Sequence, residues 1–282
     1  MDRREMLIGI FEDTQQWCRE DERLAHRIQE SIEGTKVYEE NCSFSQPSDR
    51  PFVETEITVE KARTFETALI LQRENSKDRI TVHNFASATN PGGGVTKGST
   101  AQEECLCRCS TLYPVLNTEE LKKRYYLYHR ERHDTRYTDR CIYTPGVVVI
   151  KTDTDQPCRM KEEEWCHVDV ITCAAPNLRS YPRLSMNPSS GKAAEMTNSE
   201  LLEMHKKRAR HMLYAALENQ TDILVLGAFG CGAFRNDPEV MARAYKEILP
   251  EFMGKFKKIT FAVYCSPKDS RNYDVFRRVL LL

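Results

Sequence analysis

Stretches with the repeat of a β-strand alternate with stretches with the repeat of an α-helix along most of this chain of 282 residues. Residues 53–59 alternate apolar and polar side chains, residues 62–72 repeat as a helix, and residues 79–85 have the composition of a strand. This alternation predicts an α/β domain with helices on both faces of a mixed sheet. Further strands are expected at 141–150, 168–174, 223–226 and 259–264, and further helices at 102–112, 199–218, 237–253 and 270–281.

The ends of this pattern suggest how the chain is divided. Residues 2–33 repeat as helices, and the polar segment 40–52 contains two prolines and is expected to be a loop or linker. We therefore predict an N-terminal helical extension with its linker over 1–52, packed on an α/β domain over 53–282. A second long loop is expected at 176–197 because it holds three prolines and many small polar residues.

Charge and hydropathy limit the surroundings in which the chain works. The formal net charge is −1, so no global field draws the protein to nucleic acid or to a membrane. No apolar stretch approaches the roughly 18 residues of a membrane span, and the N-terminus lacks the apolar core of a signal peptide. We expect a cytoplasmic protein, or a nuclear one in a eukaryote, with no membrane partner. The basic segment 121–140 is interpreted as an exposed charged connection, with a partner surface as the alternative.

The 11 cysteines do not have the spacing of a metal site. Zinc ligands usually come as Cys-x-x-Cys pairs, and none exists here. Cys105, Cys107 and Cys109 alternate within a predicted helix, which suits small buried side chains better than a metal cage. We expect free thiols, no metal and no cofactor.

Two glycine-rich loops each follow a predicted strand. The first contains Asn90, Pro91, Gly92, Gly93 and Gly94. The second runs over residues 227–234 and contains Gly227, Gly230, Cys231, Gly232, Ala233 and Phe234. Neither has the spacing of a dinucleotide-binding Rossmann loop or a P-loop. Each could be a plain tight turn, but together they suggest a ligand with a diphosphate between two larger groups.

The sequence Gln102-Glu103-Glu104 follows the three glycines after seven residues and opens a predicted helix. Acidic side chains stabilise a helix N-terminus, which is one sufficient explanation for their position. Neighbouring residues on a helix point about 100° apart, so these two glutamates do not face each other like the carboxylates of an ordinary glycosidase. If the site is catalytic, one carboxylate is expected to do most of the chemistry.

The glycine triplet, the seven-residue spacing and the Gln-Glu-Glu triplet together resemble the signature of poly(ADP-ribose) glycohydrolases. The resemblance is closest to the shorter, bacterial-type members and covers about residues 53–282, with the N-terminal helices similar to that subfamily's short extension. It implies a three-layer α/β/α macrodomain with a mixed central sheet.

The resemblance also implies roles for individual residues. Glu104 matches the catalytic acid/base, and Glu103 and Asn90 match residues that hold hydroxyls of the released ribose. Gln102 belongs to the same ADP-ribose-binding signature. Gly92, Gly93 and Gly94 match the loop that shapes the ribose pocket. The diphosphate loop is matched by Gly227, Gly230, Cys231, Gly232, Ala233 and Phe234.

The implied activity is hydrolysis of ribose–ribose bonds of poly(ADP-ribose) from chain ends, or removal of ADP-ribose from modified macromolecules. The expected partners are therefore ADP-ribose polymer or ADP-ribosylated protein or nucleic acid, and we expect a monomer. Two alternatives remain: a module that binds ADP-ribose without cleaving it, and an interaction protein whose glycine loops are structural turns.

Overall fold

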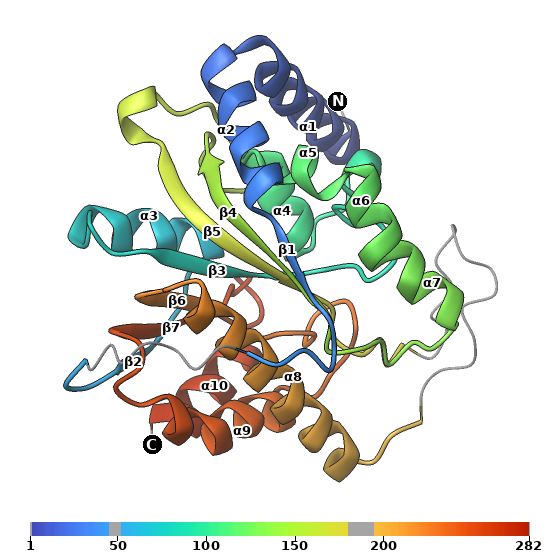
Figure 1. The fold of residues 1–282 in the computed structure, drawn as a ribbon, viewed down its shortest axis with the longest axis vertical. Coiled ribbons are helices and arrows are strands. Elements are labelled where there is room, and N and C mark those ends of the chain that lie inside the picture. Colours follow the sequence, from blue (N-terminus) through green and yellow to red (C-terminus); the bar gives the residue numbers. More distant parts are fainter. Residues whose placement is uncertain (1, 45–51, 180–194, 282) are drawn as a thin grey trace.

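The computed structural model describes residues 2–44, 52–179 and 195–281, and these form a mixed seven-stranded sheet between two layers of helices (Figure 1). The strand order is β1-β4-β5-β3-β6-β7-β2. The pairs β3·β5, β3·β6, β6·β7 and β2·β7 are parallel, whereas β1·β4 and β4·β5 are antiparallel. The strands are β1 (Lys36–Tyr38), β2 (Glu56–Glu60), β3 (Ile80–Phe85), β4 (Cys141–Val149), β5 (Cys166–Cys173), β6 (Ile223–Leu226) and β7 (Lys258–Ala262).

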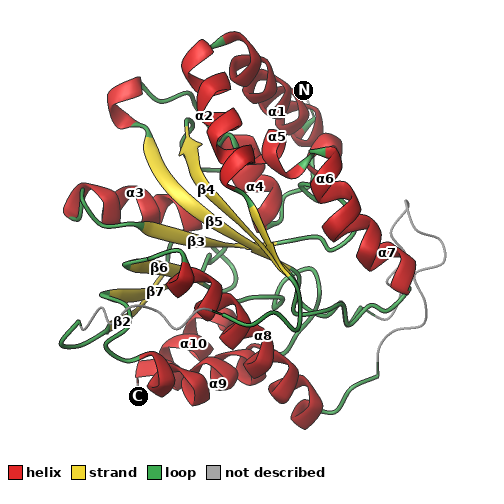
Figure 2. Cartoon of the chain, viewed as in Figure 1, coloured by secondary structure: helices red, strands yellow, loops and turns green. Residues whose placement is uncertain are grey.

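The helices cover both faces of the sheet, as predicted (Figure 2). Helices α8, α9 and α10 pack on one face, and α1, α3, α4 and α5 contribute to the apolar core on the other. The helices are α1 (Arg3–Glu20), α2 (Glu22–Gly34), α3 (Thr64–Glu74), α4 (Gln102–Cys109), α5 (Leu112–Leu116), α6 (Glu119–Leu121), α7 (Tyr128–Arg132), α8 (Asn198–Glu218), α9 (Pro238–Ile248) and α10 (Arg271–Leu281). Short turns lie at η1 (Val95–Lys97), η3 (Glu162–Glu164) and η4 (Leu249–Phe252), and a π-helical turn at η2 (Lys122–Leu127).

Strand β6 illustrates why the sheet forms where it does. All four of its side chains are buried, and they alternate between the two cores. Ile223 and Val225 belong to the core with α3 and α4, whereas Leu224 and Leu226 belong to the core with α8 and α9. A continuous apolar run of this length is what a parallel strand covered on both faces requires.

The predicted elements are confirmed with shifted ends, and the structure differs from the prediction in three regions. Strand β1 was not predicted: residues 36–38 add an edge strand to the sheet from within the segment assigned to the N-terminal extension. The helix predicted over 102–112 ends at Cys109, and α5 begins at Leu112. The boundary between residues 52 and 53 remains a prediction, and the predicted loops at 40–52 and 176–197 lie partly outside the described residues.

The expectation of an exposed connection over 121–140 is wrong for much of that segment. Residues 119–132 are helical, and Tyr125, Tyr126 and His129 are buried. The sequence pattern failed here because three consecutive basic residues, Lys122 to Arg124, are followed directly by the buried Tyr125 and Tyr126 within one π-helical turn, which has neither the α nor the β period.

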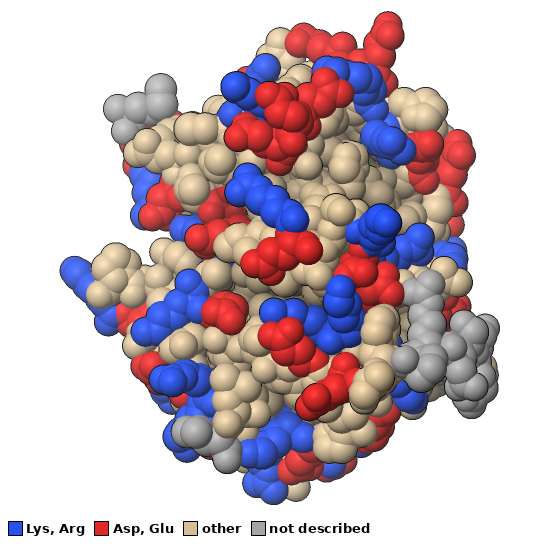
Figure 3. Space-filling view, turned by 90° about the vertical axis from the view of Figure 1, so that its left-hand side faces the viewer, with Lys and Arg blue, Asp and Glu red and all other residues tan. Residues whose placement is uncertain are grey.

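The surface charges are mixed, in line with the net charge. Figure 3 shows Lys and Arg interspersed with Asp and Glu over the face it presents. Among the described residues, no helix is long and apolar enough to cross a membrane. Cys107 and Cys109 are fully buried, as expected for small core side chains, and Cys158 is exposed.

Candidate active site at the carboxyl ends of three parallel strands

Three loops meet where the neighbouring parallel strands β3, β5 and β6 end. They are residues 86–101 after β3, residues 174–178 after β5 and residues 227–236 after β6. The backbone of Ala86 donates to Cys173 O at 2.9 Å, and the Asn236 amide donates to Pro176 O at 2.8 Å. The structure therefore brings the two predicted glycine loops to one edge of the sheet, where open α/β sheets bind ligands.

Two glutamates from the first turn of α4 are buried beneath the first loop. Glu103 is 2% exposed and Glu104 is 7% exposed. One oxygen of Glu103 accepts from Ser87 N at 2.7 Å, and the other lies 3.4 Å from the Asn84 amide. Glu104 Oε1 accepts from Gly94 N at 2.8 Å. Both carboxylates thus bind segments outside their own helix, and stabilisation of the helix N-terminus does not account for them.

Gly93 lies directly over this carboxylate pair. Its φ is +58°, and a Cβ there would stand 2.5 Å from Glu104 Oε1 and 3.1 Å from Glu103 Oε2. Gly92 also has a positive φ and lies against the Tyr113 ring. Only glycine gives this loop both the left-handed backbone and the close approach.

Gln102 ties the start of α4 to strand β3. Its side-chain oxygen accepts from Phe85 N at 2.8 Å, and its nitrogen donates to His83 O at 2.7 Å and Thr64 Oγ1 at 3.0 Å. These contacts fix where the helix begins and hence where the two glutamates lie. Its predicted contact with a ligand remains a prediction.

Asn90 is held by an arginine from the segment 121–140. Arg130 Nη2 donates to Asn90 Oδ1 at 2.9 Å, and Arg130 Nε donates to Thr89 O at 2.6 Å. The two donors of one guanidinium therefore orient both the side chain and the backbone of the loop.

The second loop is shaped around Gly230 and Asn236. Gly230 has φ +77°, and a Cβ would stand 2.6 Å from Ala175 and 2.7 Å from the Asn236 amide. That amide also donates to Gly230 O and Phe234 O, and its oxygen lies 2.9 Å from His205 Nε2. Gly227 is equally confined, because a Cβ would stand 2.6 Å from Ala262 O.

The loop leaves a row of backbone donors available. Within the described part of the chain, the N–H groups of residues 230 and 232–234 have no protein acceptor. Gly232 and Ala233 are exposed, and Cys231 and Phe234 are partly exposed. Successive unpaired N–H groups in a turn form an anion-binding concavity. Burial raises the pKa of the Cys231 thiol, so this cysteine is a neutral member of the loop.

The pKa of Glu103 is strongly shifted. Burial, followed by the negative charge of Glu104, raises the pKa of Glu103 well above its ordinary value. Hydrogen bonds from Ser87 and Asn84 oppose this shift. Glu103 therefore keeps its proton to a higher pH than an exposed carboxylate does.

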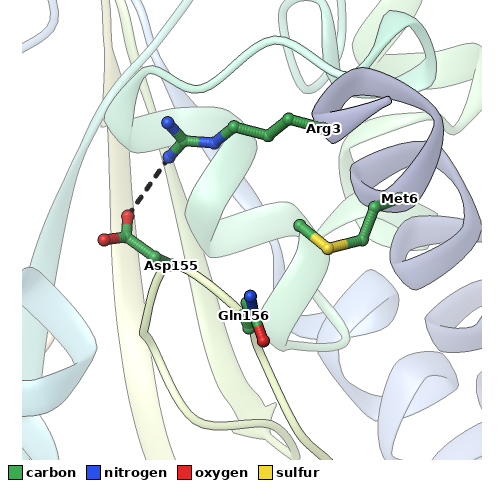
Figure 4. A pocket seen from close by; sticks show the side chains of 4 residues that line it. All are labelled: Arg3, Met6, Asp155 and Gln156. Atoms are coloured by element: carbon green, nitrogen blue, oxygen red, sulfur yellow. Dashed lines mark hydrogen bonds and ion pairs between the residues drawn. The ribbon is translucent and has the colours of Figure 1, made fainter. Parts of the chain in front are cut away.

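A small pocket of about 380 Å³ lies elsewhere, beside the first turn of α1 (Figure 4). Arg3, Met6, Asp155 and Gln156 line it, and Arg3 pairs with Asp155 at 3.3 Å. None of these belongs to the predicted site residues.

Four residues that shape the site were not predicted from the sequence: Ser87, Asn84, Arg130 and Asn236. Asn84 and Ser87 stand close to the predicted Asn90, and their position at a strand end was the only available signal. Asn236 directly precedes Asp237, the N-cap of α9, and a polar residue next to a helix cap gives no separate signal of a role in the site. Arg130 carried no signal, because it lies 40 residues along the chain from its partner.

Comparisons with known proteins identify the family to which this fold belongs. The family described as microbial-type PARG (poly(ADP-ribose) glycohydrolase), catalytic domain, matches residues 8–152. The PARG structure from Thermomonospora curvata is 30% identical, with a TM-score of 0.83 over 98% of this chain and 100% of that one. The PARG structure from Deinococcus radiodurans in complex with ADP-ribose is 32% identical, with a TM-score of 0.71 over 90% of this chain and 96% of that one. No match was found among curated protein sequences.

These likenesses cover the α/β fold as a whole, including the N-terminal helices, and they confirm the predicted resemblance and the prediction of an enzyme. The chain therefore belongs to the microbial-type poly(ADP-ribose) glycohydrolase family and carries its catalytic domain.

Proposed function

We propose that this enzyme hydrolyses ribose–ribose glycosidic bonds of poly(ADP-ribose) from chain ends, or removes ADP-ribose from modified macromolecules, with Glu104 as the acid/base. The observation that carries the proposal is the state of the Glu104 carboxylate. One oxygen is fixed by Gly94 N, and Oε2 is buried without a hydrogen-bond partner among the described residues. A buried polar atom without a partner is costly, so such an atom in a ligand-binding loop region is a candidate for contact with substrate.

The chemistry requires two proton transfers. In the first, a protonated carboxyl donates to the leaving ribose oxygen while the bond to the anomeric carbon breaks, which leaves an oxocarbenium-like ribose. In the second, the resulting carboxylate takes a proton from the water that attacks this carbon. The raised pKa of Glu103 supports a protonated carboxyl in this site, and Gly94 N–H holds Glu104 in place for both transfers.

The geometry of the second loop is consistent with binding of a ligand that has a diphosphate between two larger groups. The unpaired N–H groups of residues 230 and 232–234 suit phosphate oxygens, and the Phe234 ring beside them suits a ribose face. Known relatives support the ligand: the D. radiodurans PARG structure holds ADP-ribose, and a T. curvata PARG structure holds the inhibitor ADP-HPD. A macrodomain type of fold, a cytoplasmic location and a monomeric state remain part of this proposal.

The decisive experiment follows release of ADP-ribose from a poly(ADP-ribosyl)ated protein, with calorimetry of ADP-ribose binding in parallel. We expect Glu104→Gln to abolish release and to retain binding within a few-fold. The matched control is Glu131→Gln, an exposed residue of α7, which should leave both unchanged. Release by Glu104→Gln at the wild-type rate would refute the assignment. Binding without release by the wild-type protein would favour the non-catalytic alternative, and absence of binding would favour structural turns.

A further inference from the structure

Helix α1 makes three contacts that lead to the segment 92–99 or to α4, one of them directly with that segment, although α1 lies in the predicted N-terminal extension. The family match itself begins at residue 8, within this helix. In Figure 1, α1 lies beside α4 and α5, and it packs directly on α4 and on η1.

The first contact runs through two aromatic rings. Phe11 is 5% exposed and meets the Tyr113 ring edge-on, with the centroids 4.9 Å apart. Tyr113 in turn lies against Gly92, where a Cβ would stand 2.7 Å from its Cδ2. The Phe11 side chain therefore packs against the Tyr113 ring, and that ring contacts Gly92, the first residue of the glycine triplet.

The second contact joins α1 to the far end of α4. Thr14 is fully buried, and its hydroxyl donates to Arg108 O at 2.6 Å. This carbonyl lies in the last turn of α4, where no backbone donor follows within the helix. The Arg108 side chain links α4 to the glycine loop. Its Nη1 donates to Ser99 O at 2.6 Å, and Ser99 lies beneath Gly94.

The third contact is between backbones. Gly98 has φ +69°, and a Cβ there would stand 2.6 Å from the Arg4 carbonyl oxygen. The three contacts thus reach the beginning and the end of the segment 92–99 and the helix that carries Glu104.

We propose that α1 is a positioning element of the active site, in which Phe11 and Thr14 hold the segment 92–99 in register with α4 so that Gly94 N–H meets Glu104. This inference rests on the proposed function for its catalytic consequence, but its structural content does not. Neither side chain touches the site itself. Displacement by a fraction of an ångström between the loop and α4 lengthens the Gly94–Glu104 hydrogen bond and misdirects Glu104 Oε2.

The test uses the full chain with Thr14→Val, which keeps the side-chain shape, and Phe11→Ala, which removes the ring. The control is Leu24→Ala in α2, a fully buried residue that packs with Val148 and Ile150 away from the loop. We expect kcat for ADP-ribose release to fall about tenfold or more in both variants, because small misplacements of reacting groups cost rate steeply. The dissociation constant for ADP-ribose should change by a smaller factor than kcat, because the 227–236 loop stays in place. Leu24→Ala should lower the melting temperature while kcat stays near wild type.

Hydrogen exchange of the segment 92–99 provides a readout that does not require activity. Exchange should accelerate in Thr14→Val and Phe11→Ala and stay unchanged in Leu24→Ala. A kcat loss that only follows the unfolded fraction, or an equal loss in Leu24→Ala, would overturn the inference. If the wild-type protein released no ADP-ribose, the proposed function would fail, and the exchange comparison would still decide the role of α1.

Discussion

Replacing Gly93 with alanine should damage catalysis far more than it damages folding. The added Cβ would stand 2.5 Å from Glu104 Oε1, whereas ordinary contact begins at 3.4 Å, so the carboxylate oxygen or the loop must move by about 0.9 Å. The same move breaks the Gly94–Glu104 hydrogen bond geometry. Misplacement of a reacting group by roughly 1 Å costs about 100-fold in rate. The left-handed backbone adds about 1–2 kcal/mol of destabilisation for any residue with a Cβ.

The matched control is Gly146→Ala. Gly146 has φ +66°, close to that of Gly93, but its nearest atom to an added Cβ is Ser31 Oγ at 3.6 Å. The left-handed backbone should cost both variants about 1–2 kcal/mol in the free energy of unfolding, measured by urea denaturation, and Gly93→Ala should lose somewhat more because of its clash with Glu104. Only Gly93→Ala should lose ADP-ribose release, measured as kcat on a poly(ADP-ribosyl)ated protein. Equal kcat values for the two variants would refute the argument that Gly93 is glycine because of the carboxylates.

Three further outcomes are expected. Arg130→Lys should weaken ADP-ribose binding about fivefold in calorimetry, because loss of the two hydrogen bonds from Arg130 to Thr89 and Asn90 costs about 1 kcal/mol. Lys123→Ala, at an exposed position, is the control and should leave the affinity unchanged. Equal affinities of the two variants would contradict this prediction. Asn236→Ala should lower the free energy of unfolding by about 1–3 kcal/mol and weaken ADP-ribose binding, because it removes the amide that shapes the 227–236 loop. Burial lowers the pKa of His83 from 6.5 to about 3, so the free energy of unfolding decreases as pH falls below 6.5. In His83→Phe, denaturation curves should show a decrease that is smaller by up to about 1.4 kcal/mol per pH unit.

Local patterns were sufficient for most of the fold. The apolar run at 223–226 predicted β6, and Asp237 followed by Pro238 predicted the start of α9, where the Asp237 side chain does accept from Glu239 N. These signals depend on residues that are neighbours in the chain. Strand β1 has only three residues and pairs with β4 about 100 residues away, so no local repeat marked it.

The site was predictable only in part for the same reason. The two glycine loops and the glutamate pair have short, recognisable patterns, and their meeting followed from strand ends in a parallel sheet. Arg130, Thr14 and Phe11 act across long sequence separations, and nothing in their own neighbourhood distinguishes them from ordinary helix residues. The angle between adjacent helix positions did not predict that Glu103 and Glu104 would both reach Gly93, because two flexible methylene groups let each carboxylate bend toward the loop.

The strand order also has a consequence for how the protein matures during translation. Ile80 of β3 pairs with Ile223 of β6, 143 residues further along, and Glu56 of β2 pairs with Lys258 of β7. At about 5–20 residues per second, a ribosome needs roughly 7–30 s to supply the strand that completes the centre of the sheet. During that interval the apolar strand β3 has an open edge that a chaperone can cover or a second nascent chain can pair with. A chain truncated before residue 223 holds the glutamates without the second loop, so the complete site appears only after residue 236 has been synthesised.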